Sequence, residues 1–552
     1  MLNGAHALVQ TLIDSGVDTV FSNPGTSEMH FVAALDSAPQ MRAVLTLFEG
    51  VASGAADGYA RMTDRPAATL LHLGPGLGNA LANLHNARKA GVPIVNIVGD
   101  HATTHAPYDA QLQSDIETVA RNVSSWVRTS QATDKVSDDT AEAVAVARGM
   151  PRQISTLILP ADVSWGHVGA AAAPPLPVPV AQPPEHATVA QIAAILSAHT
   201  NTAFLLGGRA LLEPGLLAAA QIAQSCGAKL LAEVFPTRIQ RGAGLPEVER
   251  LAYFAEFAST QLAGIDNLIL VGARAPVSFF AYPGKKSDLV PEGCQVHTLA
   301  GPSHDPVQCL SELAEHLAAT GIVPNLAPAH RPARPRGKLT ADTICQAVGA
   351  VLPNNAIISD EAQTSGVMLP AMTAGAPRHD VLTLTGGAIG QGLPVAIGAA
   401  VACPDRPVLA LQADGSAMYT IQSLWTMARE KLDVTVVLVN NQSYSILNVE
   451  LQRVGAGAGG PKAKALLDLT HPNLDFVHLG RGMGVPSKRV DTAEELCTAL
   501  EEAFTRPGPH LIEAVIPPAF SGLKLKALPY AMSALNKMPA PLAKAVKRRL
   551  AP

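Results

Sequence analysis

Two short polar motifs in the last third of the chain combine residue types that can bind a metal ion together with a phosphate group. Asp414-Gly415-Ser416 follows the apolar run 407–411, and Asn441 follows the apolar run 434–439, at a separation that fits one helix and one strand. A βαβ unit brings the ends of its two parallel strands side by side. A carboxylate, an amide oxygen and a backbone carbonyl would therefore converge, and such ligands suit Mg²⁺, which completes its shell with phosphate oxygens and water. Together the two motifs predict a metal–diphosphate site.

Each motif alone has a simpler explanation. Asp, Asn and Gly are common in turns and at helix N-termini, so either motif by itself is more typical of a turn than of a binding site. The occurrence of both at consecutive strand ends favours the site, because ligands of doubly wound sheets bind beyond the carboxyl ends of the strands.

Apolar runs that alternate with helix-like stretches indicate the elements that position these motifs. Runs rich in Val, Ile and Leu are typical of parallel strands that helices cover on both faces. The predicted strands are 43–48, 67–72, 94–98, 156–159, 202–206, 229–233, 267–272, 356–359, 407–411, 434–439 and 510–516. The predicted fold class is α/β, with three doubly wound parallel-sheet domains.

Two proline-rich stretches, 173–184 and 324–336, are typical of linkers, because proline cannot donate a hydrogen bond to a sheet and favours extended chain. They divide the chain into predicted domains. The predicted boundaries are 1–170, 186–322 and 338–520, followed by a basic tail over 521–552.

The composition excludes several classes of protein. The 552 residues are 48% hydrophobic and 15% charged, and no run of apolar residues is long enough to predict a membrane span. The formal net charge of −5 argues against a nucleic-acid-binding protein. Six scattered cysteines without a CxxC pair argue against a disulfide scaffold or a zinc ribbon. The start of the chain lacks the build of a signal peptide, so we expect a cytoplasmic protein.

The two motifs also support a resemblance to a known family. ADGS at 413–416 and NNQSY at 440–444 resemble the diphosphate motif of thiamine diphosphate-dependent enzymes, with Ala413 in place of the usual glycine. The resemblance implies that Asp414, the Asn441 side chain and the Ser443 carbonyl bind Mg²⁺. It assigns further residues to the binding of thiamine diphosphate, namely Gln363, Thr364, Gly415, Ser416 and Tyr444.

The same resemblance implies residues that activate and bend the cofactor. LTLFEGVASGAADGYAR places Glu49 where the family has the glutamate that hydrogen-bonds the aminopyrimidine ring. TGGAIGQGLPVAIGAA at 385–400 matches the segment that orients the cofactor, with the Gly387 carbonyl facing its amine and Ile389 as the wedge under the thiazolium that brings its two rings together. In isolation, Glu49 would be read as a helix-terminal residue and Ile389 as a core residue.

Within the family the chain is similar to benzoylformate decarboxylase and to acetolactate synthase large subunits. NPGTSE at 23–28 places Thr26 on the decarboxylase's active-site serine, and LLHLGPGLGNA at 70–80 places His72 on a catalytic histidine. The alternative for His72 is a core histidine. The second decarboxylase histidine aligns with Phe280 or Ala281, and Glu450 stands where that enzyme has a phenylalanine, which argues against an aryl substrate.

Acetolactate synthases and pyruvate oxidase use a flavin, but their characteristic central-domain residues are not found here, so FAD is not expected. Pyruvate decarboxylase has adjacent histidines, which the spaced His101 and His105 match only loosely.

The resemblance implies thiamine diphosphate- and Mg²⁺-dependent decarboxylation of a small-molecule 2-oxo acid, with carboligation to a second carbonyl as a further outcome. Alternatives are an acetolactate synthase-type carboligase, an acyl-CoA lyase or decarboxylase with the basic tail as a lid, and a non-catalytic protein of this fold. The glycine-rich stretch 455–460 is a candidate gate. We expect a homo-oligomer, a dimer at least and a tetramer as the fuller assembly, with no nucleic-acid or membrane partner.

Overall fold

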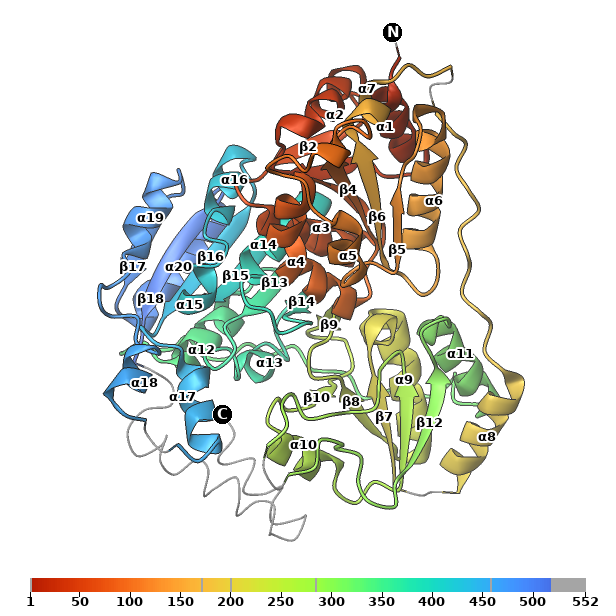
Figure 1. Ribbon diagram of the computed structural model, residues 1–552. Coiled ribbons are helices and arrows are strands. Elements are labelled where there is room, and N and C mark those ends of the chain that lie inside the picture. Colours follow the sequence, from red (N-terminus) through yellow and green to blue (C-terminus); the bar gives the residue numbers. More distant parts are fainter. Residues whose placement is uncertain (1, 170–171, 199–200, 283–284, 457–458, 518–552) are drawn as a thin grey trace.

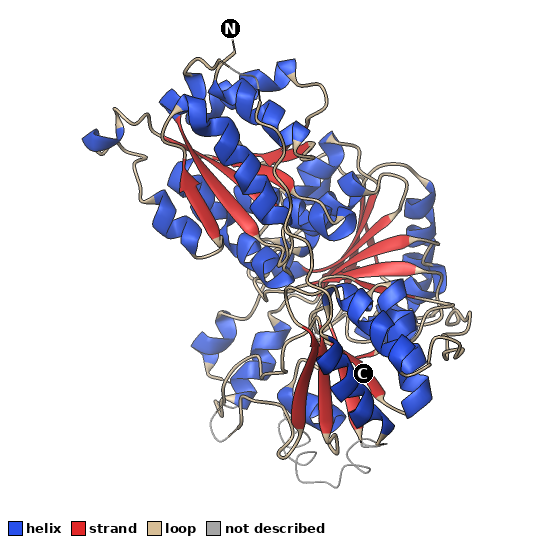
Figure 2. Cartoon of the chain, turned by 90° about the vertical axis from the view of Figure 1, so that its right-hand side faces the viewer, coloured by secondary structure: helices blue, strands red, loops and turns tan. Residues whose placement is uncertain are grey.

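The computed structural model describes residues 2–169, 172–198, 201–282, 285–456 and 459–517. Three sheets form three lobes, which lie at the top, at the lower right and at the left of Figure 1 and contain the first, second and third sheet, respectively. Helices flank each sheet (Figure 2). The predicted fold class, α/β with several doubly wound parallel sheets, is confirmed.

The first sheet has the strand order β2-β1-β3-β4-β6-β5, and every pairing in it is parallel. Its strands are β1 (Thr19–Ser22), β2 (Arg42–Leu45), β3 (Ala67–Leu71), β4 (Ile94–Asp100), β5 (Trp126–Thr129) and β6 (Ile154–Pro160). Its helices are α1 (Gly4–Asp14), η1 (Thr26–Glu28), α2 (Met29–Ala34), η2 (Leu35–Ser37), α3 (Glu49–Thr63), α4 (Leu73–Ala90), η3 (Ala106–Tyr108), α5 (Ile116–Arg121), η4 (Thr133–Lys135), α6 (Val136–Arg148) and α7 (Ala161–Trp165).

The second sheet has the order β10-β8-β7-β11-β12, and its pairings are also parallel. Its strands are β7 (Thr202–Leu206), β8 (Lys229–Ala232), β10 (Glu249–Arg250), β11 (Asn267–Val271) and β12 (Gln295–Ala300). Its helices are α8 (His186–Ser197), η5 (Gly208–Leu211), α9 (Glu213–Cys226), α10 (Ala255–Leu262) and α11 (Pro306–His316).

The third sheet has the order β17-β18-β16-β15-β13-β14-β9. Its strands are β9 (Ile239–Arg241), β13 (Ala356–Glu361), β14 (His379–Thr383), β15 (Val408–Ala413), β16 (Val434–Asn440), β17 (Ser487–Val490) and β18 (His510–Val515). Its helices are α12 (Ala341–Val351), α13 (Leu369–Met372), α14 (Gly392–Ala402), α15 (Asp414–Ala417), α16 (Ser423–Arg429), α17 (Ser445–Arg453), α18 (Pro461–Ala465), α19 (Phe476–Gly482) and α20 (Ala493–Thr505).

One strand departs from the predicted all-parallel arrangement. β9 comes from the stretch that the sequence assigns to the central domain, yet it pairs antiparallel with β14, with Val381 opposite Ile239. Because β9 is short and follows no apolar run, only its tertiary neighbour makes it a strand.

The predicted strands are all present, with slightly different ends. The largest difference lies at β2, which ends at Leu45 instead of at Phe48. Thr46 turns the chain there, because its hydroxyl donates to the carbonyls of Ser22 and Phe48. Glu49 consequently begins helix α3 directly, with Phe48 as the N-cap.

The first and third lobes meet through α3 and α14. Glycines allow the close contact of these helices: a Cβ on Gly398 would lie 1.9 Å from the Ala55 carbonyl oxygen, and one on Gly58 would lie 2.2 Å from that of Val395. The Ala- and Val-rich faces of the two helices belong to one hydrophobic core that spans both lobes. The contact fixes α3 relative to the segment that precedes α14.

The two proline-rich stretches form neither helix nor strand within their described residues. In Figure 1 the chain between α7 and α8 runs along the outside of the molecule from the first lobe to the second. The basic tail from 521 onward and part of the glycine-rich stretch 455–460 lie outside the described residues. Within the described residues, none of the helices combines the length and apolar character needed to cross a membrane.

Candidate functional site

The Asp414-Gly415-Ser416 motif and Asn441 lie side by side at one edge of the third sheet. β15 and β16 pair in parallel with Ala413 opposite Val439, so Asp414 and Asn441 follow neighbouring strand ends. Both side chains are buried. The Asp414 carboxylate accepts hydrogen bonds from the backbone N–H of Gly415 at 2.8 Å and of Gln442 at 2.6 Å. Burial raises the pKa of Asp414 to about 6, and these backbone hydrogen bonds oppose the rise.

The turn after β16 gathers oxygen ligands beside Asp414. The Asn441 side-chain oxygen accepts from the Ser443 N–H at 3.1 Å, and the Ser443 carbonyl accepts from the Ser445 N–H at 2.8 Å. The Tyr444 ring covers Gly415, where a Cβ would lie 2.5 Å from Cε1, so this position accepts only glycine. No cluster of three His, Cys, Asp or Glu side chains suited to a metal occurs in the described part of the chain.

These residues fit a metal–diphosphate group. A single buried carboxylate with amide and carbonyl oxygens is the kind of donor set that Mg²⁺ uses when phosphate oxygens and water complete its octahedron. A bound cation would further offset the burial of Asp414, which the backbone hydrogen bonds offset only in part, because a nearby positive charge favours the ionised carboxylate.

Ser416, Gln363 and Thr364 lie at the same edge of the sheet. The Ser416 hydroxyl accepts a hydrogen bond from Gln412 at 2.6 Å and donates to the Ala413 carbonyl at 3.1 Å, so it is already bonded within the chain. Gln363 and Thr364 form the turn after β13, which pairs with β15, and Gln363 has a positive φ of 40°.

A buried carboxylate, which no sequence motif indicated, binds the segment that precedes α14. Glu361, at the end of β13, accepts from the backbone N–H groups of Gly390, Gln391 and Gly392 at 2.7, 3.2 and 2.7 Å. Burial raises the pKa of Glu361, while a hydrogen bond from Gln412 and these backbone bonds lower it.

Gly387 and Ile389 lie on this loop, where Ile389 is partly exposed. Gly387 has a positive φ of 78°, which favours glycine, and the tip of the exposed Phe279 ring lies close to it, 2.5 Å from where a Cβ would be. The neighbouring carbonyls of Gly386 and Ala388 accept hydrogen bonds from His85 and Asn86. The Gly387 carbonyl has no donor among the described residues, which fits a group that would receive an amine from a cofactor.

Glu49 lies in the first lobe, buried at the start of α3. Its Oε2 accepts from the Asn79 side chain at 3.0 Å. A Cβ on Gly76 would lie 3.4 Å from Glu49 Oε1 and also 3.4 Å from the Cβ of His72. Glu49 Oε1 and the Cβ of His72 are therefore both close to Gly76. No hydrogen bond or ion pair joins Glu49 to Asp414 or to the turn after β16 within the described chain.

His72 is the N-cap of α4 and has partners that the sequence analysis missed. Its Nδ1 lies 2.9 Å from Glu28 Oε2 and 3.1 Å from Ser27 Oγ. Glu28 is 2% exposed and also accepts from the Gly25 N–H at 2.8 Å and from the Ser27 hydroxyl at 2.5 Å. Thr26, the residue predicted from the NPGTSE motif, begins η1 but makes none of these contacts with His72.

A signal for Glu28 was available in the sequence. A glutamate three residues after an N-cap is one half of a capping box, and Glu28 makes this half in η1 by accepting from the Gly25 N–H; Gly25 has no side chain to make the other half. Gly25 is required for the contact, because a Cβ there would lie 2.2 Å from the His72 ring.

The positions aligned with the second decarboxylase histidine and with the pocket phenylalanine show different chemistry. Phe280 is exposed, and its ring packs edge-on against Phe279. Glu450, on α17, pairs with Arg453 at 3.1 Å and accepts from the Tyr282 hydroxyl. Glu450 is thus paired within α17, and the hydrogen bond from Tyr282 connects α17 to the second lobe.

His101 follows β4 in the first lobe. Its buried Nε2 has no hydrogen-bond partner within the described chain, and its ring lies 5.2 Å from that of His105.

Comparison with known proteins gives the family directly. The family described as "Thiamine pyrophosphate enzyme, N-terminal TPP binding domain" matches residues 2–121, and "Thiamine pyrophosphate enzyme, C-terminal TPP binding domain" matches residues 360–514. Thiamine pyrophosphate is another name for thiamine diphosphate. The first match includes Glu49 and the second includes Asp414.

Relatives match over nearly the whole chain. A protein of Mycobacterium tuberculosis named "Putative acetolactate synthase large subunit IlvX" is 59% identical over 517 residues, which cover 94% of this chain and 99% of that protein. Benzoylformate decarboxylase of Pseudomonas aeruginosa is 28% identical over 523 residues, covering 90% of this chain and 96% of that protein.

Solved structures share the fold. The thiamine diphosphate-dependent 4-hydroxybenzoylformate decarboxylase of Rhodococcus jostii RHA1 superposes with a TM-score of 0.82 at 24% identity and covers 94% of this chain and 99% of that chain. The family matches, the extent of the relatives and the shared fold agree with the resemblance that the motifs indicated. The chain belongs to the thiamine diphosphate-dependent enzymes.

Proposed function

We propose that this protein catalyses the thiamine diphosphate- and Mg²⁺-dependent decarboxylation of a 2-oxo acid, with carboligation to a second carbonyl as a further outcome. The observation that carries the proposal is that Glu49 Oε1 and the Cβ of His72 lie near each other, each 3.4 Å from the position that a Cβ on Gly76 would take. A carboxylate suited to activate the cofactor thus lies beside an imidazole suited to move protons during the reaction.

Bound thiamine diphosphate would supply the carbon nucleophile that attacks the 2-oxo group and the electron sink that accepts the electrons left when CO₂ departs. Glu49 would hold the aminopyrimidine ring by a hydrogen bond, with Asn79 fixing the carboxylate from the other side. The Gly387 carbonyl would receive the exocyclic amine, and Ile389 would pack under the thiazolium ring of the cofactor. Asp414, Asn441 and the Ser443 carbonyl would hold Mg²⁺ at the diphosphate.

The hydrogen bonds around His72 assign its protons. An ionised Glu28 can only accept, and the Ser27 hydroxyl already donates to it, so Nδ1 of His72 carries the hydrogen that points to Glu28. Nε2 then presents a lone pair in the neutral ring, with no partner among the described residues. His72 can therefore take a proton at Nε2 and return it, which is the step that releases an aldehyde after CO₂ has left.

Acetolactate synthase-type carboligation is the second candidate, favoured by the name of the relative that is 59% identical. It uses the same cofactor residues and differs only in what receives the carbon nucleophile after decarboxylation. The exposed Phe279 and Phe280 beside Gly387 would then border the site of the second carbonyl. FAD is not part of this proposal.

The proposal includes a homodimer or a tetramer. In the family to which the chain belongs, the cofactor lies between the first lobe of one subunit and the third lobe of another. The absence of a hydrogen bond between Glu49 and the Asp414 motif within the described chain is consistent with that arrangement.

The first experiment incubates the purified protein with thiamine diphosphate, Mg²⁺ and a panel of 2-oxo acids, and follows CO₂ release and products. Aldehyde formation establishes a decarboxylase, and acetolactate from pyruvate establishes the carboligase, assayed with and without added flavin. CO₂ release from none of the acids contradicts the proposal and favours acyl-CoA chemistry or a non-catalytic role.

A further inference from the structure

We infer that Arg61, together with its ion-pair partner Asp57, is a positioning residue that sets the conformation of the loop 385–391. This loop carries Gly387 and Ile389, so the inference rests on the proposed function for its consequence in cofactor binding. Arg61 lies near the end of α3, the helix that Glu49 begins.

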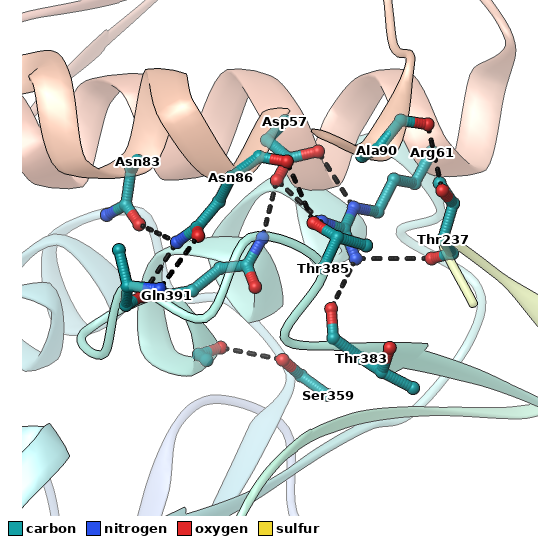
Figure 3. A network of polar contacts seen from close by, with 12 residues as sticks. Asp57, Arg61, Asn83, Asn86, Ala90, Thr237, Ser359, Thr383, Thr385 and Gln391 are labelled. Atoms are coloured by element: carbon teal, nitrogen blue, oxygen red, sulfur yellow. Dashed lines mark hydrogen bonds and ion pairs between the residues drawn. The ribbon is translucent and has the colours of Figure 1, made fainter. Parts of the chain in front are cut away.

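Every donor of the Arg61 guanidinium is used, and its acceptors come from three separate stretches of chain (Figure 3). Nε and Nη2 each donate to the Asp57 carboxylate at 2.7 Å. Nη1 donates to the carbonyls of Thr237 and Thr383 at 3.2 and 2.8 Å, and Nη2 also donates to the Thr385 hydroxyl at 3.0 Å. A guanidinium is the side chain that can bind five acceptors in one fixed plane.

The loop itself is bonded to this pair and to α4. Gln391 donates to Asp57 Oδ2 at 2.7 Å, so both ends of the loop meet the ion pair. Between them, the Asn86 side chain donates to the Ala388 carbonyl at 2.7 Å and accepts from the Ala388 N–H at 3.1 Å, and Asn83 donates to the Gly390 carbonyl at 3.2 Å. Figure 3 shows these side chains converging on the loop from α3 and α4.

The Thr385 hydroxyl connects the two sets of contacts. It accepts from Arg61 and donates to the Asn86 backbone carbonyl at 2.8 Å. Arg61 therefore acts on the start of the loop directly, and on Ala388 through the α4 backbone that Thr385 holds. The result is a loop in which the carbonyls on either side of Gly387 are occupied while that of Gly387 has no donor among the described residues.

Stability alone does not account for this pair. Both side chains are fully buried, at 0% exposure, and two buried charges are costly to desolvate, so an apolar pair of the same size is often as stable or more so. An apolar pair could not bind two carbonyls, a hydroxyl and an amide in one geometry. That capacity is what the loop requires, because its position decides where a cofactor's ring system would rest.

Arg61→Lys tests the inference, because lysine keeps the charge but has one nitrogen in place of the planar fork. We expect amide hydrogen exchange in residues 383–392 of the cofactor-free protein to speed up about tenfold, and the affinity for thiamine diphosphate to fall by about the same factor, as the loss of one or two hydrogen bonds predicts. Exchange in β5 and α6 should be unchanged.

Thr385 supplies a second test that leaves the ion pair intact. Thr385→Val removes the hydroxyl and should speed exchange in the same segment, and Thr385→Ser, which keeps the hydroxyl, should restore it. Arg128→Lys is the matched control, since Arg128 pairs with Asp139 and Glu142 in the same lobe and contacts nothing in the loop.

Unchanged exchange in 383–392 for both Arg61→Lys and Thr385→Val overturns the inference, as does a uniform increase over the whole chain that follows global stability. Because exchange is measured without cofactor, its outcome does not depend on catalysis. Faster local exchange in a protein that decarboxylates no 2-oxo acid would uphold the positioning role while the proposed function fails.

Discussion

Glu28 holds the His72 ring in one orientation, and the tautomer that we propose for His72 follows from this contact. The carboxylate is buried and collects hydrogen bonds from Gly25, Ser27 and His72. Because a neutral imidazole must have one donor and one acceptor nitrogen, fixing the donor at Nδ1 also fixes the acceptor at Nε2. The resemblance placed His72 by its motif, but its partners became visible only when β3 and η1 were brought together.

His72→Ala should lower the rate of turnover by about 10²–10⁴-fold, the usual range for loss of a general acid–base group. Glu28→Gln should lower it by less, because glutamine still fills the space but no longer holds the imidazole as a carboxylate does. Neither change should weaken thiamine diphosphate binding, which calorimetry measures. Ser27→Ala is the control with the smallest expected effect, and full activity of His72→Ala would refute the role proposed for this residue.

Asp414→Asn should weaken Mg²⁺-dependent thiamine diphosphate binding by at least about tenfold, because the amide keeps the shape but removes the charge that a divalent cation needs. Titration of the cofactor at fixed Mg²⁺ measures the change, and chelation of Mg²⁺ should have the same effect on the unsubstituted protein. Asp433→Asn, at the other end of β16, is the matched control. Equal affinities for the two variants would contradict the metal site.

At the scale of elements, the packing of α3 against α14 fixes the position of the first lobe relative to the third. Gly398 faces the Ala55 carbonyl so closely that no side chain fits between the helices. Interiors packed at this density resist even one added methyl group. The helix that begins with Glu49 and the loop that leads into α14 therefore move as one unit.

Gly398→Ala should lower the free energy of unfolding by about 1–3 kcal/mol, the usual cost of overpacking. Denaturant titration of the whole chain measures it. Gly482→Ala is the control, since a Cβ there meets nothing within 4 Å and α19 should keep or slightly gain stability. If Gly398→Ala proved as stable as the control, the close helix contact would be wrong.

The strands that could be predicted from the sequence are those whose apolar composition alone determines them. Apolar runs such as 202–206 and 434–439 are strands because burial on both faces demands such residues, and the structure places β7 and β16 there. β9 and β1 lack such runs, so pairing with neighbours distant in sequence decides them. Glu361 was missed for the same reason: its role comes from the loop 390–392, which lies close to it only after folding.

Outside the site the molecule also contains carboxyl groups with a raised pKa, and the partly buried Glu233 in the second lobe is one of them. Burial raises the pKa of Glu233 to about 7, and the Gly208 N–H, which donates to it at 3.3 Å, opposes the rise. The folded protein therefore keeps the proton at a pH where the unfolded chain has lost it. The contribution of this group to the free energy of unfolding is largest below about pH 4.5, and it declines as the pH rises to about 7.

Glu233→Gln removes this dependence. The variant should be more stable than the unsubstituted protein at pH 8 by about 1–3 kcal/mol, and the difference should shrink toward pH 5. Urea titrations at the two pH values give the measurement. Glu292→Gln, at an exposed carboxylate, is the control, and a difference for Glu233→Gln that does not vary with pH would contradict the assignment.

β9 has a consequence for how the protein can be shortened. It covers the outer edge of β14, a strand whose Val381 would otherwise offer unpaired backbone groups to solvent. A natural or engineered version without the central lobe would lose this cover and present an open strand edge, the kind of surface on which chains join one another into aggregates. The central lobe thus also shields the catalytic sheet from self-association, so an internal deletion would have to keep residues 239–241 or replace them with a charged or proline-bearing edge.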